Sequence, residues 1–377
     1  MNNAKNTTLF PYLERLLEGE AVEWKTLGEV AEIGTGSSNR QDEAENGLYP
    51  FYVRSKNILR SPTYQFDETA IIIPGEGGIG DIFHYAEGKY ALHQRAYRIK
   101  VNTENELFPK FLFYYMTNTF KSFILSRCVG ATATSIRKPM LADFPIPLPP
   151  LRVQARIVEI LDKFTQLEAE LEAELEARKK QYAYYCDQLL NFSQYPPLNV
   201  NIEWKTLGEM CDTVKAASKL KSADYCVSGK VPIIDQGAQY IAGYTDKELA
   251  TIPKDEYIIF GDHTETIKFV DFEFVQGADG LKILHSKKAL NKYVYYAFSN
   301  FYQKTGAYKR HWSKAKETAI PLPPLSEQRR IVDILDRFDT LTNSISEGLP
   351  KEIALRRKQY EYYRDALLSF PRPEVSA

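Results

Sequence analysis

The chain has 377 residues and a mass of 43.3 kDa, which is enough for two or three domains of ordinary size. Its hydrophobic fraction of 44% and charged fraction of 26% exclude a disordered or low-complexity chain. The 48 basic residues nearly balance the 49 acidic ones, so the overall charge gives no indication of nucleic-acid binding.

No run of uncharged apolar residues is long enough to cross a membrane, and the N-terminal residues lack the apolar core of a secretory signal. The four cysteines form no Cys-x-x-Cys pair, which argues against a cysteine zinc site and is typical of a reducing compartment. We therefore expect a cytoplasmic protein.

The motifs along the chain form an internal repeat. After a short helical segment at 1–21, two globular segments are predicted over residues 22–145 and 202–318. Each opens on Glu-Trp-Lys-Thr-Leu-Gly-Glu, at 23–29 and at 203–209. Each globular segment is followed by a helical region, at 146–201 and at 319–377. Near its start each helical region carries Ile-Pro-Leu-Pro-Pro-Leu, at 146–151 and at 320–325.

Within the globular segments, short runs of β-branched and aromatic residues separated by turn residues predict strands. In chain order these strands lie at 70–74, 82–85, 90–92, 257–260, 267–270 and 272–274. One helix is expected in each segment, at 109–126 and 291–303. The predicted fold class is α+β, with two globular domains that alternate with two long helices.

The helical regions carry apolar residues at heptad spacing, which is typical of a coiled coil. No glycine or proline interrupts Arg156–Phe192, so one long helix is expected there. Gly348 and Pro350 predict a break or kink in the second region. The seam residues are Ile157, Leu161, Phe164, Leu171, Leu175, Tyr182, Tyr185, Leu189, Ile331, Leu335, Phe338, Tyr360, Tyr363 and Leu367.

Motifs that would indicate catalysis are absent or have a simpler explanation. Gly75–Gly80 matches the dinucleotide-binding pattern Gly-x-Gly-x-x-Gly, but a strand and not a helix is predicted to follow it, which favours a hairpin turn. Glu23 and Lys25 resemble half of a nuclease site, but no suitably placed aspartate precedes them. The five histidines show no metal-ligand spacing, so neither a catalytic nor a metal site is predicted.

A basic cluster stands out against this near-neutral background. Residues 304–316 contain five cations and no acid, with aromatic residues between them, which is the electrostatic footprint of a phosphate-binding surface. The alternative is a solvated basic loop with Trp312 in the core. The corresponding residues of the first copy, 130–138, are also free of acids and rich in hydroxyl groups.

From this cluster, its counterpart and the polar loops near them we select candidate DNA-binding residues. They are Tyr308, Lys309, Arg310, His311, Trp312, Lys314, Thr132, Thr134, Ser135, Arg137, Lys138, Arg54, Lys56, Asn57, Arg60, Gln236, Gln239 and Tyr240.

Taken together, these motifs resemble the specificity (S) subunit of type I restriction–modification systems. The resemblance rests on the doubled layout, on the Glu-Trp-Lys-Thr-Leu-Gly-Glu openings and on Pro-Leu-Pro-Pro-Leu-x-x-Gln-x-x-Ile, which occurs at 147–157 and at 321–331 with Gln154 and Gln328 in place. It implies two target-recognition domains, each reading one half of a bipartite double-stranded DNA site.

The resemblance also implies that the long helices pair antiparallel as a spacer and that their seam residues serve as a subunit interface. The implied partners are two methyltransferase (M) subunits and restriction (R) subunits. AdoMet, ATP and Mg would be bound by those partners, and no cofactor by this chain. Because the two globular segments differ in sequence, the two half-sites are expected to differ.

Two other classes of function remain open at this point. One is a coiled-coil interaction scaffold without a DNA function, and the other is a nuclease fused to a coiled coil. Salt-dependent DNA binding would exclude the first, and metal-dependent cleavage by the isolated chain would support the second.

Overall fold

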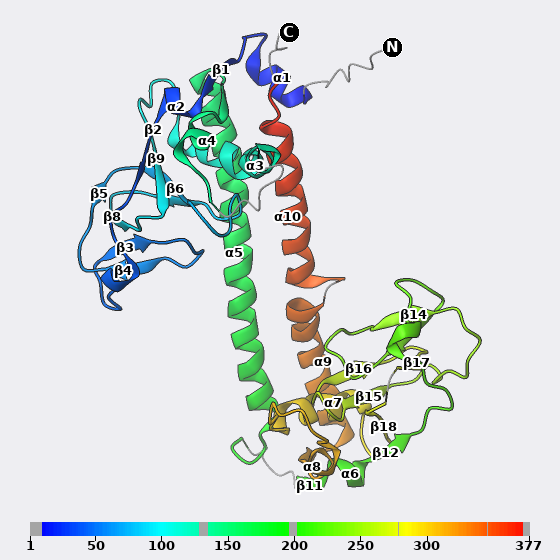
Figure 1. The fold of residues 1–377 in the computed structure, drawn as a ribbon. Helices are drawn as coiled ribbons and strands as arrows, with labels where there is room; N and C mark the ends of the chain where they lie inside the picture. The colour runs from blue at the N-terminus through cyan, green and yellow to red at the C-terminus, as the bar shows by residue number, and fades with distance from the viewer. Residues whose placement is uncertain (1–9, 128–134, 196–201, 278, 345, 372–377) are drawn as a thin grey trace, which may run out of the picture. The chain divides into compact units, whose positions relative to one another are not determined.

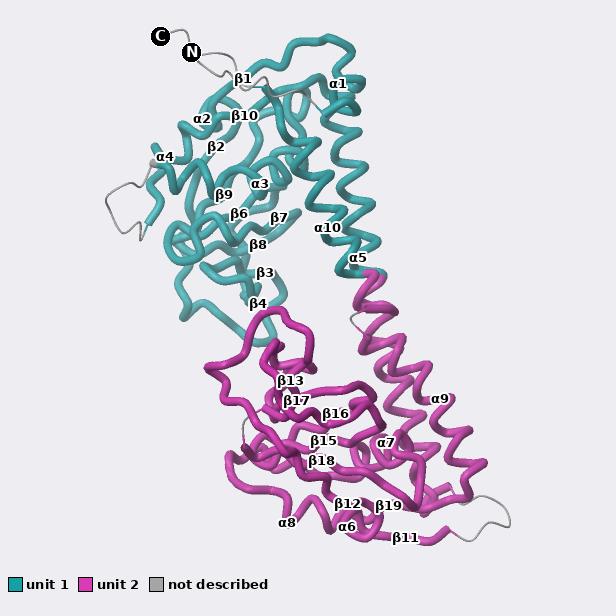
Figure 2. The backbone as a smooth tube through the Cα atoms, turned by 90° about the vertical axis from the view of Figure 1, so that its right-hand side faces the viewer, with its two compact units in different colours: residues 1–170, 353–377 teal, residues 171–352 magenta. Residues whose placement is uncertain are grey.

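The computed structural model describes residues 10–127, 135–195, 202–277, 279–344 and 346–371. It divides into two compact units, which are residues 1–170 with 353–377 (unit 1) and residues 171–352 (unit 2) (Figure 2). Each unit holds one predicted globular segment together with portions of the long helical regions. The repeat in the sequence is therefore a repeat of folded units.

Unit 1 contains two four-stranded sheets, β2-β9-β6-β7 and β4-β3-β8-β5, and the two-stranded pair β1-β10 (Figure 1). Its core lies where helix α3 packs on the first of these sheets and on the start of α5. In chain order the elements are α1 (Pro11–Leu17), β1 (Glu23–Thr26), α2 (Leu27–Val30), β2 (Ala31–Thr35), η1 (Arg40–Asp42), β3 (Tyr49–Tyr52), β4 (Leu59–Ser61), β5 (Phe66–Asp67), β6 (Ala70–Pro74), β7 (His84–Ala86), β8 (Lys89–Leu92), β9 (Ala96–Val101), α3 (Pro109–Arg127), α4 (Lys138–Ala142), β10 (Pro145–Leu148) and the first part of α5 (Leu151–Leu190).

Unit 2 repeats this plan with a four-stranded sheet, β12-β18-β15-β16, a three-stranded sheet, β14-β13-β17, and the pair β11-β19. Its elements are the second part of α5, β11 (Glu203–Thr206), α6 (Leu207–Met210), β12 (Cys211–Val214), η2 (Ser222–Asp224), β13 (Val231–Ile234), β14 (Gly243–Thr245), β15 (Tyr257–Gly261), β16 (Ile267–Val270), β17 (Val275–Gln276), β18 (Leu281–Ser286), α7 (Asn291–Phe301), α8 (Trp312–Ala315), β19 (Ala319–Leu322), α9 (Leu325–Asn343) and the start of α10 (Gly348–Leu367), whose remainder belongs to unit 1.

Most of the predicted strands and both predicted helices are confirmed. The strand expected at 272–274 is wrong: Phe274 makes only an isolated bridge with Ile252, and the chain then enters the other sheet as β17. The glycine-rich stretch after β6 leads into β7 without a helix, and Gly77, Gly78 and Gly80 have positive φ. This segment is thus a turn, as expected, and offers no helix N-terminus to a dinucleotide.

The repeated opening and closing motifs pair with each other. Strand β1 runs antiparallel to β10, with Trp24 opposite Pro147, and β11 pairs with β19 in the same register, with Trp204 opposite Pro321. The helix that follows each opening strand begins with a capping box between Thr26 and Glu29, or its equivalent in unit 2. These motifs therefore close each globular segment at its base.

The glutamine of the repeated proline-rich motif explains that motif. Gln154 is fully buried, accepts a hydrogen bond from the Phe108 backbone N–H at 2.9 Å and donates to the Pro149 carbonyl at 2.8 Å. Gln328 does the same with Leu290 and Pro323, at 2.9 and 2.8 Å. Each glutamine thus satisfies backbone groups at the start of one helix while it anchors the next.

The long helices pair within each unit. In unit 1, the Phe164 ring of α5 stacks on Tyr363 of α10 at 5.6 Å, and Glu168 further along α5 pairs with Arg357, which precedes Tyr363 on α10. The contacts therefore run antiparallel. In unit 2, Tyr185 of α5 stacks on Phe338 of α9 at 5.1 Å.

The predicted break in the second helical region is confirmed, since α9 ends at Asn343 and α10 begins at Gly348. Gly348 has a φ of +71°, and a Cβ atom there would lie 2.4 Å from the Thr340 carbonyl oxygen. A residue with a side chain could not take this path without moving the end of α9.

Part of the predicted subunit interface needs correction. Ile157, Leu161, Ile331 and Leu335 are fully buried, and Leu367 is 1% exposed, all within the core of their own unit. These side chains have no free surface for another subunit, because heptad spacing marks any buried helix face and does not say which element covers it.

We predict that Gln328→Ala lowers the free energy of unfolding of unit 2 by about 1–3 kcal/mol, because it leaves the Leu290 N–H and the Pro323 carbonyl without partners. Thermal or urea unfolding measures the change. Gln303→Ala, at an exposed position, is the matched control and should have little effect. Equal stability of the two variants would contradict this role for Gln328.

Candidate nucleic-acid interface

Four segments that are distant in sequence meet at the same place in each unit. In unit 1 the Gly75 N–H, just after β6, donates to the Arg95 carbonyl at 2.9 Å, and the Gly75 carbonyl accepts from the Ile136 N–H at 2.7 Å. In unit 2 the Asp262 N–H donates to the Gly280 carbonyl at 2.6 Å, and its carbonyl accepts from the His311 N–H at 2.9 Å.

The fourth segment is the loop after β3 in unit 1 and the loop after β13 in unit 2. Strand β3 pairs in parallel with β8, and β13 pairs in parallel with β17. Tyr52 lies opposite Leu92 in unit 1, and Ile234 lies opposite Gln276 in unit 2, so the loops after β3 and β13 are equivalent. By this register Gln236 occupies the place of Arg54. We call the surface formed by these four segments the loop surface of each unit.

In unit 2 the basic cluster lies on this loop surface. Lys304, Lys309, Arg310 and Lys314 are exposed, and none of them has a carboxylate partner among the residues that the structure describes. Tyr308 is 83% exposed and its ring stacks on His263 at 5.5 Å. The cationic groups are therefore available to an external anion.

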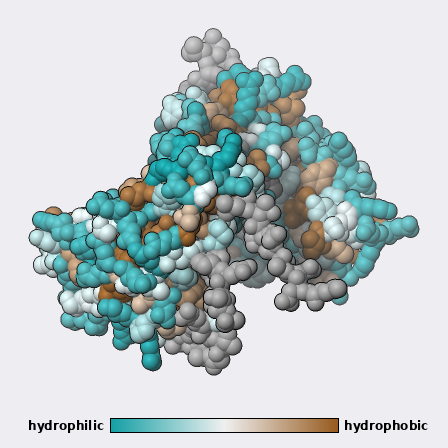
Figure 3. Space-filling model, turned by 90° about the horizontal axis from the view of Figure 1, so that it is seen from above, coloured by the Kyte–Doolittle hydropathy of each residue, from teal (hydrophilic) through white to brown (hydrophobic). Residues whose placement is uncertain are grey.

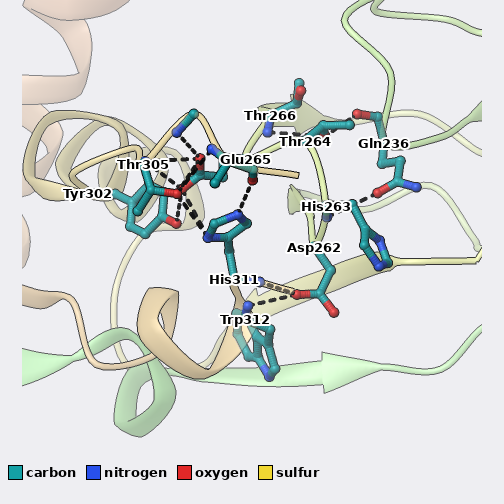
Figure 4. A network of polar contacts seen from close by, with 12 residues as sticks. Gln236, Asp262, His263, Thr264, Glu265, Thr266, Tyr302, Thr305, His311 and Trp312 are labelled. Carbon is teal, nitrogen blue, oxygen red and sulfur yellow. Dashed lines mark hydrogen bonds and ion pairs between the residues drawn. The ribbon is translucent and has the colours of Figure 1, made fainter. Parts of the chain in front are cut away.

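Two buried carboxylates hold the basic cluster in position (Figure 4). Asp262 accepts the backbone N–H groups of His311 and Trp312 at 2.9 and 2.7 Å, at the start of α8. Glu265 is 2% exposed, and its carboxylate accepts the Tyr302 hydroxyl at 2.7 Å and the Thr305 and Gly306 N–H groups at 2.9 and 2.8 Å.

The sequence analysis did not identify Glu265, which has a φ of +55° although it is not a glycine. Burial opposes ionisation of this carboxyl group, but the hydrogen bonds from Tyr302, Thr305 and Gly306 and the neighbouring His311 outweigh that effect and lower its pKa to about 2. Glu265 is thus ionised at neutral pH and fixes the first half of the loop.

Of the predicted contact residues, His311 has a different role from the one expected, whereas Trp312 packs towards the core, which was the alternative considered for it. His311 is 1% exposed, with Nε2 2.7 Å from the Ala307 carbonyl and Nδ1 3.3 Å from Glu265, so its side chain belongs to the interior of the loop and is not available to DNA. Trp312 is half-buried and packs against Phe260 with a centroid distance of 6.1 Å. The charge pattern identified the loop but could not distinguish the residues on its surface from the residues that support it.

The loop after β13 is organised by a lysine that the sequence analysis missed. Lys268 is 5% exposed and donates from Nζ to the Asp235 and Gln239 carbonyls at 2.9 and 2.5 Å. Burial lowers the pKa of this lysine, and nearby Asp235 opposes that change.

Among the three candidates of this loop, Gln239 is exposed, whereas Gln236 and Tyr240 use their polar atoms internally. Gln236 accepts the His263 N–H at 3.2 Å and donates to the Asp279 carbonyl at 3.2 Å. The Tyr240 hydroxyl donates to the Phe269 carbonyl at 2.7 Å, although the ring is 46% exposed.

In unit 1 the candidates lie on two neighbouring segments. Ser135, Arg137 and Lys138 are exposed, and Ser135 forms a bridge with Glu76. Thr132 and Thr134 lie outside the described residues. Lys56, Asn57 and Arg60 are exposed in and after the loop that follows β3, although Arg60 donates to the Gly47 carbonyl at 3.0 Å.

Arg54 of the same loop pairs with Glu76. A hollow of about 650 Å³ lies here, lined by Arg40, Val53, Arg54, Ser55, Asn57, Leu59, Glu76, Gly77 and His93. Arg40, Glu76 and His93 were not predicted, because they lie far apart in the sequence and belong to no local pattern.

Among the described residues, no group of three or more His, Cys, Asp or Glu side chains is placed to hold a metal ion. In the same part of the chain, none of the helices combines the length and apolar character needed to traverse a bilayer. The face seen in Figure 3 is largely hydrophilic, with apolar patches between the polar regions.

We predict that Glu265→Gln lowers the free energy of unfolding of unit 2 by roughly 2–4 kcal/mol at pH 7, because the amide has no charge and one acceptor oxygen instead of two. The folded pKa of Glu265 lies below its ordinary value of 4.5, so its contribution is complete above pH 4.5 and is lost as the pH falls towards 2. The difference in melting temperature between variant and wild type should therefore be constant above pH 4.5 and shrink as the pH falls from 4.5 towards 2. Glu317→Gln, at an exposed position, is the control. A difference that did not depend on pH would show that the Glu265 charge is not involved.

Comparisons with known proteins agree with the family resemblance found in the sequence. The family model for the type I restriction modification DNA specificity domain matches the chain twice, at residues 20–177 and 199–355. The chain is 31% identical over 406 aligned residues to the EcoR124I/EcoR124II type I restriction enzyme specificity subunit of Escherichia coli, covering 97% of this chain and 98% of that one. It is 34% identical to S.HindORF215P of Haemophilus influenzae, which is named for the same class of subunit, over 95% of this chain and 98% of the relative.

The fold is also similar to that of a solved structure, the type I restriction–modification S subunit of M. genitalium. The two share a TM-score of 0.66 at 17% identity, over 94% of this chain and 98% of that one. Two matches to one domain model in a single chain agree with the two units described above. The chain therefore belongs to the family of type I restriction–modification DNA specificity subunits.

Proposed function

We propose that this chain recognises a bipartite, asymmetric site in double-stranded DNA, with one half-site read by the loop surface of each unit. The observation that carries the proposal is the exposed cationic segment 304–314, which two buried carboxylates hold in a fixed conformation. Because the same four segments meet in unit 1 with different side chains, two unlike half-sites are expected.

The chemistry of the unit 2 loop surface fits a nucleic acid. The exposed cations at Lys309, Arg310 and Lys314 suit phosphates, and an arginine can also bind guanine through two hydrogen bonds. Tyr308 presents an exposed aromatic ring beside them, which suits contact with a sugar or a base. Since the backbone of this loop is held by Asp262 and Glu265, less conformational entropy of the backbone is lost on binding.

We further propose that the chain works as the non-catalytic subunit of a complex with two methyltransferase subunits and with restriction subunits. In this proposal AdoMet, ATP and Mg are bound by those partners, and the complex acts in the cytoplasm. A solved structure that is similar to this chain, with a TM-score of 0.54, is described as showing the structural basis of complex assembly and conformational transition of the type I R-M system.

The seam residues that are buried in the core of their own unit offer no docking surface to the methyltransferases. The exposed faces of the long helices are better candidates, and they carry an exposed tyrosine at the same position of the repeat, Tyr184 in α5 and Tyr362 in α10, with 60% and 62% exposure. An equivalent residue on each of two helices suits two copies of one partner. A coiled-coil scaffold without a DNA function stays the alternative, but it gives no role to the cationic loop.

We predict that Lys309→Ala, Arg310→Ala and Lys314→Ala together weaken specific binding by the assembled methyltransferase complex and reduce its salt dependence, with a slope lower by about 2–3 in log–log terms. Binding would be measured between 50 and 200 mM salt. The matched control is Lys254→Ala with Lys287→Ala, two exposed lysines at the other ends of β15 and β18. Unchanged affinity and slope in the triple variant would refute the DNA-binding role of this loop.

A second prediction concerns modularity. Because the pairs β1-β10 and β11-β19 close each segment, residues 27–144 or 207–318 should be exchangeable for the matching segment of a relative. Each exchange should change one half of the methylation motif and leave the other half unaltered, as read from a methylation map. A change in both halves, or in neither, would contradict the assignment of one half-site to each unit.

A further inference from the structure

Two arginines from different loops meet on one carboxylate in the loop surface of unit 1. Arg54, in the loop after β3, and Arg95, just after β8, both donate through Nη1 to Oε1 of Glu76, and the Arg95 bond is 2.8 Å long. Glu76 belongs to the turn after β6. These two bonds and the nearby guanidinium charges lower the pKa of Glu76, although some burial opposes this, so the carboxylate is ionised at neutral pH.

The backbone around the pair is fixed by close packing. A Cβ atom at Gly75 would lie 2.9 Å from the Arg95 carbonyl oxygen, which explains the glycine at this position. His93 is 8% exposed, and its Nδ1 accepts the Arg95 N–H at 3.0 Å. Arg95 thus starts from a rigid segment, and only its side chain extends into solvent.

Both guanidinium groups keep a free edge. The side chains of Arg54 and Arg95 are 44% and 58% exposed, whereas Glu76 is 29% exposed. Each arginine uses Nη1 for Glu76, and its Nε and Nη2 groups have no acceptor among the residues that the structure describes. The Nε and Nη2 groups together form the planar fork that binds two acceptors at once.

The position of this pair within the unit is informative. By the backbone bonds described above, Arg54, Glu76 and Arg95 correspond to Gln236, His263 and Gly280 of unit 2, where His263 supports Tyr308 beside the basic cluster. In unit 1 the pair lies beside Ser135, on the segment that corresponds to the cluster. In unit 1 the cations therefore come from two separate loops. In unit 2 the cations at the equivalent place come from one continuous segment.

We infer that the pair of Arg54 and Arg95, oriented by Glu76, reads a guanine in the half-site of unit 1 through the fork of one of the two arginines. This inference rests on the proposed function and assigns to one unit a base and the residues that select it. Guanine is the base that offers two acceptors, O6 and N7, on its major-groove edge, and they match the guanidinium fork. The Glu76 carboxylate is a positioning group, because it holds both forks before DNA arrives.

The competing role for the same arginines is phosphate binding. A phosphate contact depends mainly on charge, so lysine can replace arginine, whereas bidentate recognition of guanine depends on the planar fork. The variant Arg54→Lys with Arg95→Lys keeps both charges and therefore distinguishes the two roles. Arg15→Lys, at an exposed position of α1 outside the loop surface, is the matched control and should leave binding and the motif unchanged.

The test uses the assembled methyltransferase complex, its methylation motif and its binding to duplexes with single base-pair changes. We expect the double lysine variant to lose about 10- to 100-fold in discrimination at one G·C pair of the unit 1 half-site, with the salt slope unchanged. Glu76→Gln should relax the same position to a smaller extent. The wild-type complex, tested on duplexes in which 7-deazaguanine replaces each guanine in turn, should lose a similar factor at that position, because the N7 acceptor is missing.

Several outcomes would overturn the inference. They are an unaltered motif and unaltered discrimination in the double variant, relaxation at an A·T pair, or a wild-type complex that is indifferent to 7-deazaguanine in that half-site. The experiment with 7-deazaguanine needs no variant, so it can refute the inference even if the double variant does not assemble. A wild-type complex without any sequence-specific binding would instead refute the proposed function.

Discussion

The architecture of each unit depends on the short antiparallel pair that joins the beginning of its globular segment to its end. Strand β1 meets β10, and β11 meets β19, in the same register, so that the variable loops are held on a closed base. Buried Gln154 and Gln328 connect that base to the helices by satisfying backbone groups at two helix starts. The repeated motifs are thus explained by this base, and none of them lies on the loop surfaces.

On this common base the two units present different chemistry. Unit 2 carries its cations on one continuous segment, which Asp262 and Glu265 fix through backbone N–H groups. Unit 1 brings Arg54 and Arg95 together on Glu76 from two loops. The closing pairs share one register, so both units have the same kind of base, and the difference between the two half-sites in the proposed function is assigned to the loops.

Buried charges have a structural role on these surfaces. Glu265 and Lys268 are 2% and 5% exposed, and their charged groups are satisfied by hydrogen bonds to the loops that they support. Such groups add little net stability compared with apolar residues, but leaving one without partners is costly, so they select one loop conformation. Preordered loops lower the entropic cost of binding, which suits a protein that must discriminate between similar DNA sequences.

The sequence determined the repeat, the α+β class, the long α5 helix, the interruption at Gly348 and the place of the basic cluster in unit 2. All of these are local patterns, which arise from hydrophobic periodicity, turn residues or contiguous charge. Heptad spacing identified Ile157, Leu161, Ile331 and Leu335, which are buried, but it could not show that their own unit covers them. His311 was predicted to contact DNA because it lies among the cations of this loop. The sequence does not show in which direction its side chain points.

Only the tertiary structure showed that His311 points inward and that Glu265, Lys268 and Arg95 take part in the loop surfaces. The side chains of Arg54, Glu76 and Arg95 meet because β3 pairs in parallel with β8 and because the turn after β6 is bonded to the segment after β8. Contacts of this kind depend on the register between strands that are distant in the chain. No local pattern carries that register, and for this reason the sequence identified the cations of unit 2, which are contiguous, and missed Arg95 in unit 1.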